Sequence, residues 1–250
     1  MGIVIKNESQ IELMRIAGHI CAKVHELLAT YIKPGVTTQE LDHIAHDYIL
    51  SQGAIPSFLG YRGYPASSCI SINNEVIHGI PGMRKLKQGD IVSVDIGVCY
   101  KHYHGDAARS HIVGDAPEEH RNLVATAEAA FFAGMQYARL GHNLHDISAA
   151  IGDYVHAQGF SIVEEWCGHG IGRQLHEDPQ IPHSRQERRG PRLASGMTLA
   201  IEPMINAGNG QTVVSEDAWT VVTKDGKYSA HYENTVLITD GAPQMLTLCG

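Results

Sequence analysis

Apolar residues recur every three to four positions across residues 9–31, as Met14, Ile20 and Val24 illustrate. This spacing places them on one face of a helix, so it predicts an amphipathic helix. Pro34-Gly35 follows, and neither residue suits a helix interior, so the helix should end before it.

Three further segments have helical patterns. Thr37-x-x-Glu40 has the form of a capping box, so we expect a second helix from there to about Gln52. Apolar periodicity predicts two more helices, over residues 118–138 and 144–158.

The remaining segments alternate as strands do. We expect strands over residues 65–80 and 90–113, and again from residue 161 onward. Lys224-Asp225-Gly226-Lys227 has the composition of a tight hairpin turn.

The order helix, helix, strands therefore occurs twice. This repeat predicts an α+β fold in which two related halves, residues 1–115 and 116–250, face each other across one sheet. No linker rich in proline or serine separates the halves, so we expect residues 1–250 to form a single domain.

Each half carries a glycine, an apolar strand and then a carboxylate. The first stretch runs from Gly89 to Asp95 and the second from Gly196 to Glu202. A further carboxylate follows a tyrosine in each half, at Asp106 and at Glu233. Acids within apolar strands are costly to bury unless a partner neutralises them, and a pair of divalent cations is such a partner.

Asp95 and Asp106 can be placed in a hairpin. If Tyr100-Lys101 is its centre, the two acids lie directly opposite each other with Cβ atoms ~4.5–5.5 Å apart. Acids this close repel unless cations lie between them. The alternatives are a solvated hairpin for Asp106, a buried arginine partner for Glu202 and an exposed strand start for Glu233.

Between the two halves lies Gly168-His169-Gly170-Ile171-Gly172. Its glycine spacing does not fit a dinucleotide or phosphate loop. The glycines instead allow close backbone approach and leave the imidazole of His169 free to point into a cavity. One histidine among four carboxylates favours Mn, Fe(II) or Co(II) over structural zinc.

Composition narrows the function further. The net charge of −8 and the absence of a basic run argue against direct nucleic-acid binding or membrane-surface binding. Residues 1–10 do not resemble a signal peptide, and no apolar stretch is long enough to span a bilayer. Five cysteines without a CxxC pair fit a reducing cytoplasm better than a disulfide framework.

Residues 166–181, WCGHGIGRQLHEDPQI, resemble the signature of the type I methionine aminopeptidases in their bacterial single-domain form. The positions that match the metal ligands of that family, in order and context, are Asp95, Asp106, His169, Glu202 and Glu233. His78 also matches a family histidine. The resemblance covers nearly the whole chain and implies the pita-bread fold, with a mainly antiparallel curved sheet.

Roles follow from the resemblance. Asp95 would chelate one cation, Asp106 and Glu233 would bridge, and His169 and Glu202 would complete the second site. The two cations could be Co, Mn, Fe(II) or Zn. The implied catalytic residues are His78 and His176, which would contact the substrate, and Glu202, which would carry a proton from a metal-bridged hydroxide to the leaving amine.

The implied substrate is the N-terminal methionine of nascent polypeptides, removed at the ribosome when a small residue follows. We expect a cytoplasmic monomer. An apolar slot for the methionine would be formed by Phe58, Tyr61, Tyr64, Cys69, Leu175 and Trp219. For each of these, packing in the core is the alternative. Phe58, Trp166 and Leu175 depart from the commonest family pattern, and they bear on the shape of the slot.

Two rival functions remain. The chain could be a small Xaa-Pro peptidase of the same fold, or a non-catalytic binding module. Phosphoester hydrolysis is less suitable, because no cluster of arginine or lysine accompanies the acids.

Overall fold

The computed structural model describes residues 2–249. Its helices are α1 (Glu8–Tyr31), α2 (Thr38–Ser51), α3 (Glu118–Met135) and α4 (Leu144–Ala157), with a 3₁₀ turn η1 (Tyr61–Gly63). The strands are β1 (Ile55–Pro56), β2 (Cys69–Ile72), β3 (Glu75–Ile77), β4 (Ile91–Tyr100), β5 (Tyr103–Ile112), β6 (Ser161–Ile162), β7 (Gly168–Gly170), β8 (Glu177–Ile181), β9 (Thr198–Ile201), β10 (Met204–Asn206), β11 (Thr212–Val214), β12 (Val221–Thr223), β13 (Ser229–His231), β14 (Asn234–Leu237) and β15 (Gln244–Met245).

The four predicted helices are present. The predicted capping box is confirmed, since Thr37 Oγ1 accepts from the Glu40 amide and the Glu40 side chain accepts from the Thr37 amide. The helix predicted over residues 118–138 ends earlier, at Met135, where a turn begins. In the described residues, no helix is both long enough and apolar enough to cross a membrane.

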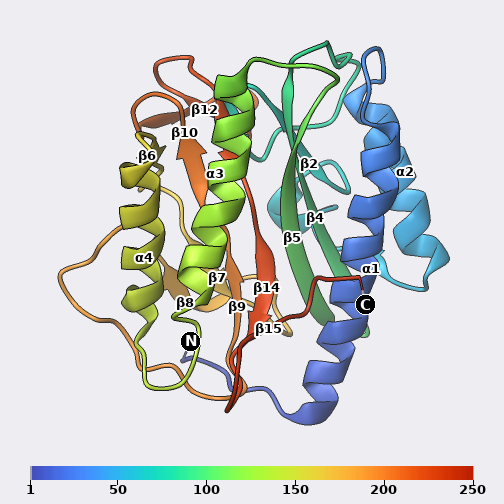
Figure 1. The fold of residues 1–250 in the computed structure, drawn as a ribbon. Coiled ribbons are helices and arrows are strands. Elements are labelled where there is room, and N and C mark those ends of the chain that lie inside the picture. The colour runs from blue at the N-terminus through green and yellow to red at the C-terminus, as the bar shows by residue number, and fades with distance from the viewer. Residues whose placement is uncertain (1, 250) are drawn as a thin grey trace.

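Two helix pairs enclose the strands. Figure 1 shows α1 and α2 on one side, α3 and α4 on the other, and β14, β5 and β4 between them. One apolar core lies under α1 and α2, with Leu28, Leu41 and Ile96 fully buried. Another lies under α3 and α4, around Phe131 and Ile151. This α+β arrangement of mainly antiparallel strands agrees with the predicted fold class.

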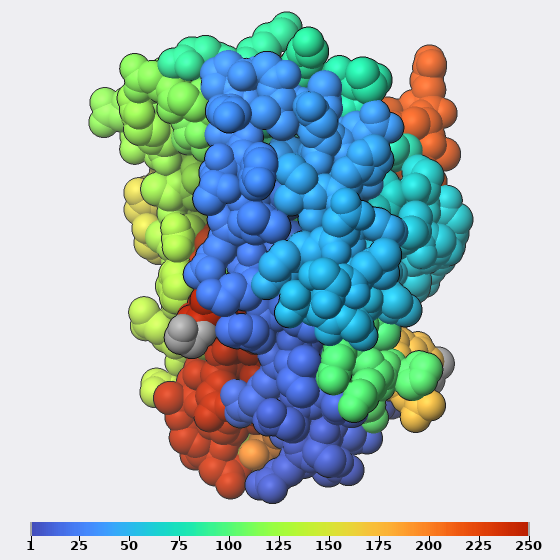
Figure 2. Space-filling view, turned by 90° about the vertical axis from the view of Figure 1, so that its right-hand side faces the viewer, coloured from blue at the N-terminus to red at the C-terminus, as the bar shows by residue number. Residues whose placement is uncertain are grey.

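The outer face shows how tightly α1 is held. Figure 2 shows α1 and α2 in blue over most of the face turned to the viewer, with the red C-terminal segment beside α1. A Cβ on Gly105 of β5 would lie only 2.7 Å from the amide nitrogen of Gly18 in α1. Glycine at these positions lets the helix backbone approach the strand backbone closely.

Contacts between strands β5 and β14 link the two predicted halves. The Asp106 amide donates to Thr235 Oγ1 (2.9 Å), and the Glu233 amide donates to the Ala108 carbonyl (3.0 Å). Acids from different halves are thereby brought together. That residues 1–250 form a single domain with halves at 1–115 and 116–250 stays a prediction.

Two predicted turns differ from the structure. The β4–β5 hairpin turns at Lys101-His102, so Asp95 lies opposite Ala108 and Asp106 lies opposite Gly97. The direct pairing of Asp95 with Asp106 was therefore wrong by two residues, although both side chains still lie on one face.

The hairpin predicted at residues 224–227 was also wrong. A turn is present, but β12 before it pairs with β11 and β3, whereas β13 after it pairs with β10. The chain changes sheets at this turn, so the strands on its two sides do not pair with each other.

Candidate active site

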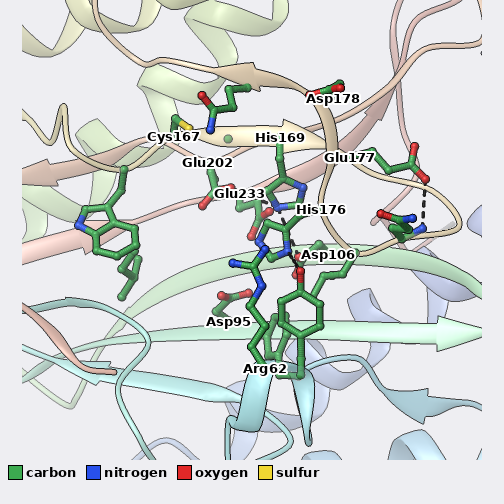
Figure 3. Close-up of a pocket in the computed structure, with 18 of the residues that line it drawn as sticks. Arg62, Asp95, Asp106, Cys167, His169, His176, Glu177, Asp178, Glu202 and Glu233 are labelled. Carbon is green, nitrogen blue, oxygen red and sulfur yellow. Dashed lines mark hydrogen bonds and ion pairs between the residues drawn. The ribbon is translucent and has the colours of Figure 1, made fainter. Parts of the chain in front are cut away.

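Side chains from two of the four sheets meet in one cavity of about 950 Å³. One sheet contains β1, β2, β4 and β5, and the other contains β7, β8, β9, β14 and β15. The candidate ligands are Asp95 on β4, Asp106 on β5, His169 on β7, Glu202 directly after β9 and Glu233 directly before β14. All five line this cavity, and Figure 3 shows them gathered there. Strand pairing aligns His169, Glu202 and Glu233, since β9 lies between β7 and β14.

The acids and the histidine are close together. His169 Nε2 lies 3.5 Å from Glu202 Oε1 and 3.9 Å from Asp106 Oδ2. One ligand atom each from Asp106, His169 and Glu233 lies within 4.8 Å of the others. These distances suit side chains that share bound cations.

Burial makes the acids costly without a counter-charge. It is the largest cause that raises the pKa of Asp95, Asp106, Glu202 and Glu233. Repulsion from Asp106 raises the pKa of Asp95, Glu202 and Glu233 further. Glu233 is only 2 % exposed, which excludes the exposed strand start considered for it.

The unpartnered atoms of the cavity fit divalent cations. Asp95 Oδ1, Asp106 Oδ1 and Glu233 Oε1 are buried without a hydrogen-bond partner among the described residues. Buried oxygens are rarely left unsatisfied, so these call for a ligand. His169 Nδ1 contacts the Gly170 carbonyl at 2.9 Å, and a carbonyl only accepts. The Nδ1 atom therefore carries the proton, which leaves the Nε2 lone pair free for a metal.

His176 is held beside this cluster. Its ring stacks on Tyr61 at 5.2 Å and lies 4.1 Å from the ring of His169. Its Nδ1 atom lies 2.9 Å from the Tyr61 hydroxyl. His176 is exposed toward the cavity, but the side chains around its ring displace water from it. This desolvation, followed by charge repulsion from neighbours, lowers the pKa of His176 to about 3, so the imidazole is neutral.

His78 lies on another part of the wall. It follows β3 with a positive φ of 59°, and its ring meets Trp166 edge-on at 5.4 Å. Burial lowers the pKa of His78 to about 4. Both predicted catalytic histidines thus face the cavity in neutral form.

The predicted slot residues also line this cavity, and all of them belong to one apolar cluster. Tyr64 and Trp219 meet edge to face at 5.1 Å. Phe58, Cys69 and Leu175 are each less than 10 % exposed. Pocket lining and core packing are therefore combined in the same side chains.

Sequence reasoning missed several residues. Arg109 donates to the carbonyl of Glu233 and to Asn234 Oδ1 (2.6 Å), and its guanidinium lies 4.5 Å from the Tyr232 ring centre. It therefore positions the Glu233 segment. A cation inside the strand pattern of 90–113 was the available signal. Arg62 also lines the cavity, and no pattern in the sequence pointed to it, whereas Trp166, which was expected to affect the shape of the slot, does line the cavity.

Comparisons with known proteins agree with this geometry. Residues 12–240 match the model of metallopeptidase family M24. The methionine aminopeptidase of Clostridium perfringens is 52 % identical over 246 residues, which cover 98 % of this chain and 99 % of that protein. Methionine aminopeptidase 1 of Bacillus subtilis is 49 % identical over 245 residues, covering 98 % and 99 %.

A solved structure gives the same result. The crystal structure of methionine aminopeptidase from Rickettsia prowazekii superposes with a TM-score of 0.97 at 39 % identity. The match covers 99 % of this chain and 100 % of that one. The chain therefore belongs to metallopeptidase family M24, with the pita-bread fold, and within that family to the methionine aminopeptidases.

Proposed function

We propose that this enzyme hydrolyses the peptide bond after an N-terminal methionine, using two divalent cations held by Asp95, Asp106, His169, Glu202 and Glu233. The main support is that buried carboxylate oxygens without a hydrogen-bond partner in the described chain lie beside an apolar cavity. Bound divalent cations act as Lewis acids and make water nucleophilic near neutral pH. Co, Mn, Fe(II) and Zn all suit these donors.

His176 supplies a hydrogen bond to the reacting carbonyl. When the Tyr61 hydroxyl donates to His176 Nδ1, the Nε2 atom carries the proton and can donate into the cavity. A donor aimed at the developing oxyanion stabilises the transition state more than the ground state. The low pKa supports this role, since a neutral ring keeps the tautomer set by Tyr61.

Glu202 and His78 complete the chemistry. Glu202 moves the proton from the nucleophile to the leaving amine, and its position within 3.5 Å of His169 Nε2 keeps it among the ligands. His78 orients the scissile amide from the opposite wall, where Trp166 supports its ring.

Specificity comes from the apolar slot of Phe58, Tyr61, Tyr64, Cys69, Leu175 and Trp219. A thioether is flexible and polarizable, and it makes favourable contacts with aromatic rings. The enzyme prefers a small residue after the methionine.

We place the reaction on nascent polypeptides at the ribosome, carried out by a cytoplasmic monomer. All five cysteines are free, which supports a reducing compartment.

The test is an activity assay after chelation. Met-Ala-Ser, Leu-Ala-Ser and Ala-Pro-Ser peptides are supplied while Mn, Fe(II), Co and Zn are added back singly. We expect release of methionine from the first peptide only, and only with metal. Preferential cleavage before proline would instead favour an Xaa-Pro peptidase, and a metal-loaded but inactive protein would favour a binding module.

A further inference from the structure

Arg62 lies at the mouth of the cavity, in the short turn η1 that also carries Tyr61. Figure 3 shows its side chain extending toward His176. The side chain is exposed, so it can meet a peptide entering or leaving the cavity.

The backbone presents Arg62 in a fixed way. Its φ is +50°, a conformation that residues other than glycine seldom adopt. The turn is closed by a hydrogen bond from the Gly60 amide to the Tyr64 carbonyl (2.8 Å) and by one from the Gly63 amide to the Gly60 carbonyl (3.1 Å). Strained backbone of this kind is common at binding sites, where the surrounding structure holds it.

In the part of the chain that the structure describes, no carboxylate neutralises Arg62. Within residues 2–249 no ion pair involves it, and its guanidinium carbon lies 5.4 Å from the centre of the Tyr61 ring. Two acids that line the cavity but are not proposed metal ligands have other partners. Glu177 forms an ion pair with Lys6, and Glu165 accepts a hydrogen bond from the Thr212 amide. The guanidinium therefore remains able to bind an anion.

We propose that Arg62 binds a carboxylate on the part of the peptide beyond the second residue, and so makes acidic peptides better substrates. The inference rests on the proposed function, because it places the methionine in the slot and the rest of the chain at the mouth. Arg62 is next to Tyr61, which stacks on His176, so a peptide held by His176 passes close to it. The carboxylate can be an acidic side chain at the third residue or the C-terminus of a short peptide.

Two peptide pairs separate these sources. Met-Ala-Asp-Ser amide is compared with Met-Ala-Asn-Ser amide, which differs by the side-chain carboxylate alone. Met-Ala-Ser as the free acid is compared with its amide. With the metal-loaded enzyme we expect kcat/KM to favour the acid in one pair or both by about fivefold, mainly through KM. The ratio should fall as NaCl rises from 0.05 to 0.5 M.

Variants then assign the preference to Arg62. Arg62→Asn removes the charge while tolerating the positive φ, so folding is preserved and the ratio should drop to about one. Arg62→Lys should keep part of it. Arg139→Asn, which removes an exposed arginine outside the cavity, should leave the ratio as it is in the parent protein.

Two results would overturn the inference while the proposed function stands. One is cleavage of all the methionyl peptides without preference for the acids, and the other is an Arg62→Asn variant that keeps the preference. If no methionyl peptide is cleaved at all, the proposed function fails and this inference fails with it.

Discussion

Lys6 Nζ lies 2.6 Å from Glu177 Oε2, and both side chains are buried, at 2 % and 8 % exposure. The ammonium also donates to the Val4 carbonyl at 3.2 Å, and Glu177 Oε1 accepts from the Gln174 amide at 3.1 Å. The pair thus ties the N-terminal segment to the loop that carries His176. Because both groups are out of water, each depends on the other for neutralisation.

Replacing Lys6 with Met should lower the free energy of unfolding by about 3 kcal/mol, because Glu177 would remain buried without its partner. The double variant Lys6→Met with Glu177→Met should recover most of this loss. Urea unfolding of the three proteins measures both effects. Lys23→Met, which breaks the exposed pair with Glu26, is the control and should be nearly neutral. A double variant as unstable as the single one would show that the charges are not coupled.

Replacing His176 with Ala should lower kcat by about 10²–10³-fold, since it removes the donor proposed for the oxyanion. Metal binding should persist, because His176 is not among the proposed ligands. Steady-state kinetics are combined with calorimetric titration of metal into the chelator-treated protein. Tyr61→Phe, which removes the hydroxyl 2.9 Å from Nδ1, should cause a smaller loss in kcat. If metal content falls in step with activity, the assignment is wrong.

Replacing Asp106 with Asn should have opposite effects with and without metal. The metal-free variant should be more stable than the parent, because a buried negative charge that raises the pKa of Asp95, Glu202 and Glu233 is gone. Metal affinity should fall at least about tenfold, because a loss of this size follows even when a residue that only hydrogen-bonds to a metal ligand is replaced. Thermal unfolding with chelator and with Mn measures both. Equal destabilisation in the two conditions would contradict a ligand role.

Stability should fall in mild acid partly because of His111. Burial, and next the charge of Arg109, lowers the pKa of His111 to about 4, and its Nε2 atom is buried without a partner in the described chain. The folded state therefore takes up this proton less readily than the unfolded chain, whose histidine pKa is about 6.5. The contribution is fully present above pH 6.5 and is lost as pH falls from there toward 4.

His111→Gln should therefore lose about 2 kcal/mol less stability than the parent between pH 7.5 and pH 5. Urea unfolding at the two pH values measures the difference. His19→Gln, at an exposed position of α1, is the matched control and should leave the loss of stability unaltered. An acid-induced loss as large in His111→Gln as in the parent would refute the assignment.

Local sequence determined the helices and the chemical character of the site. Helical periodicity and the reciprocal cap of Thr37 and Glu40 depend on residues three or four apart, so they can be recognised in the chain itself. A charge within an apolar strand is also visible there, which is why Asp95 and Glu202 stood out as candidate ligands. The order of acids and histidine was enough to indicate the family.

Tertiary structure decided what depends on distant partners. The hairpin register was misjudged because Lys101 and His102, neither of them a typical turn residue, adopt positive φ. The turn near Asp225 was misjudged because pairing partners lie in different sheets. Lys6 and Glu177 are 171 residues apart, and Arg109 reaches Glu233 across 124. Such contacts arise from the packing of segments that lie far apart in the chain, and no local pattern encodes them.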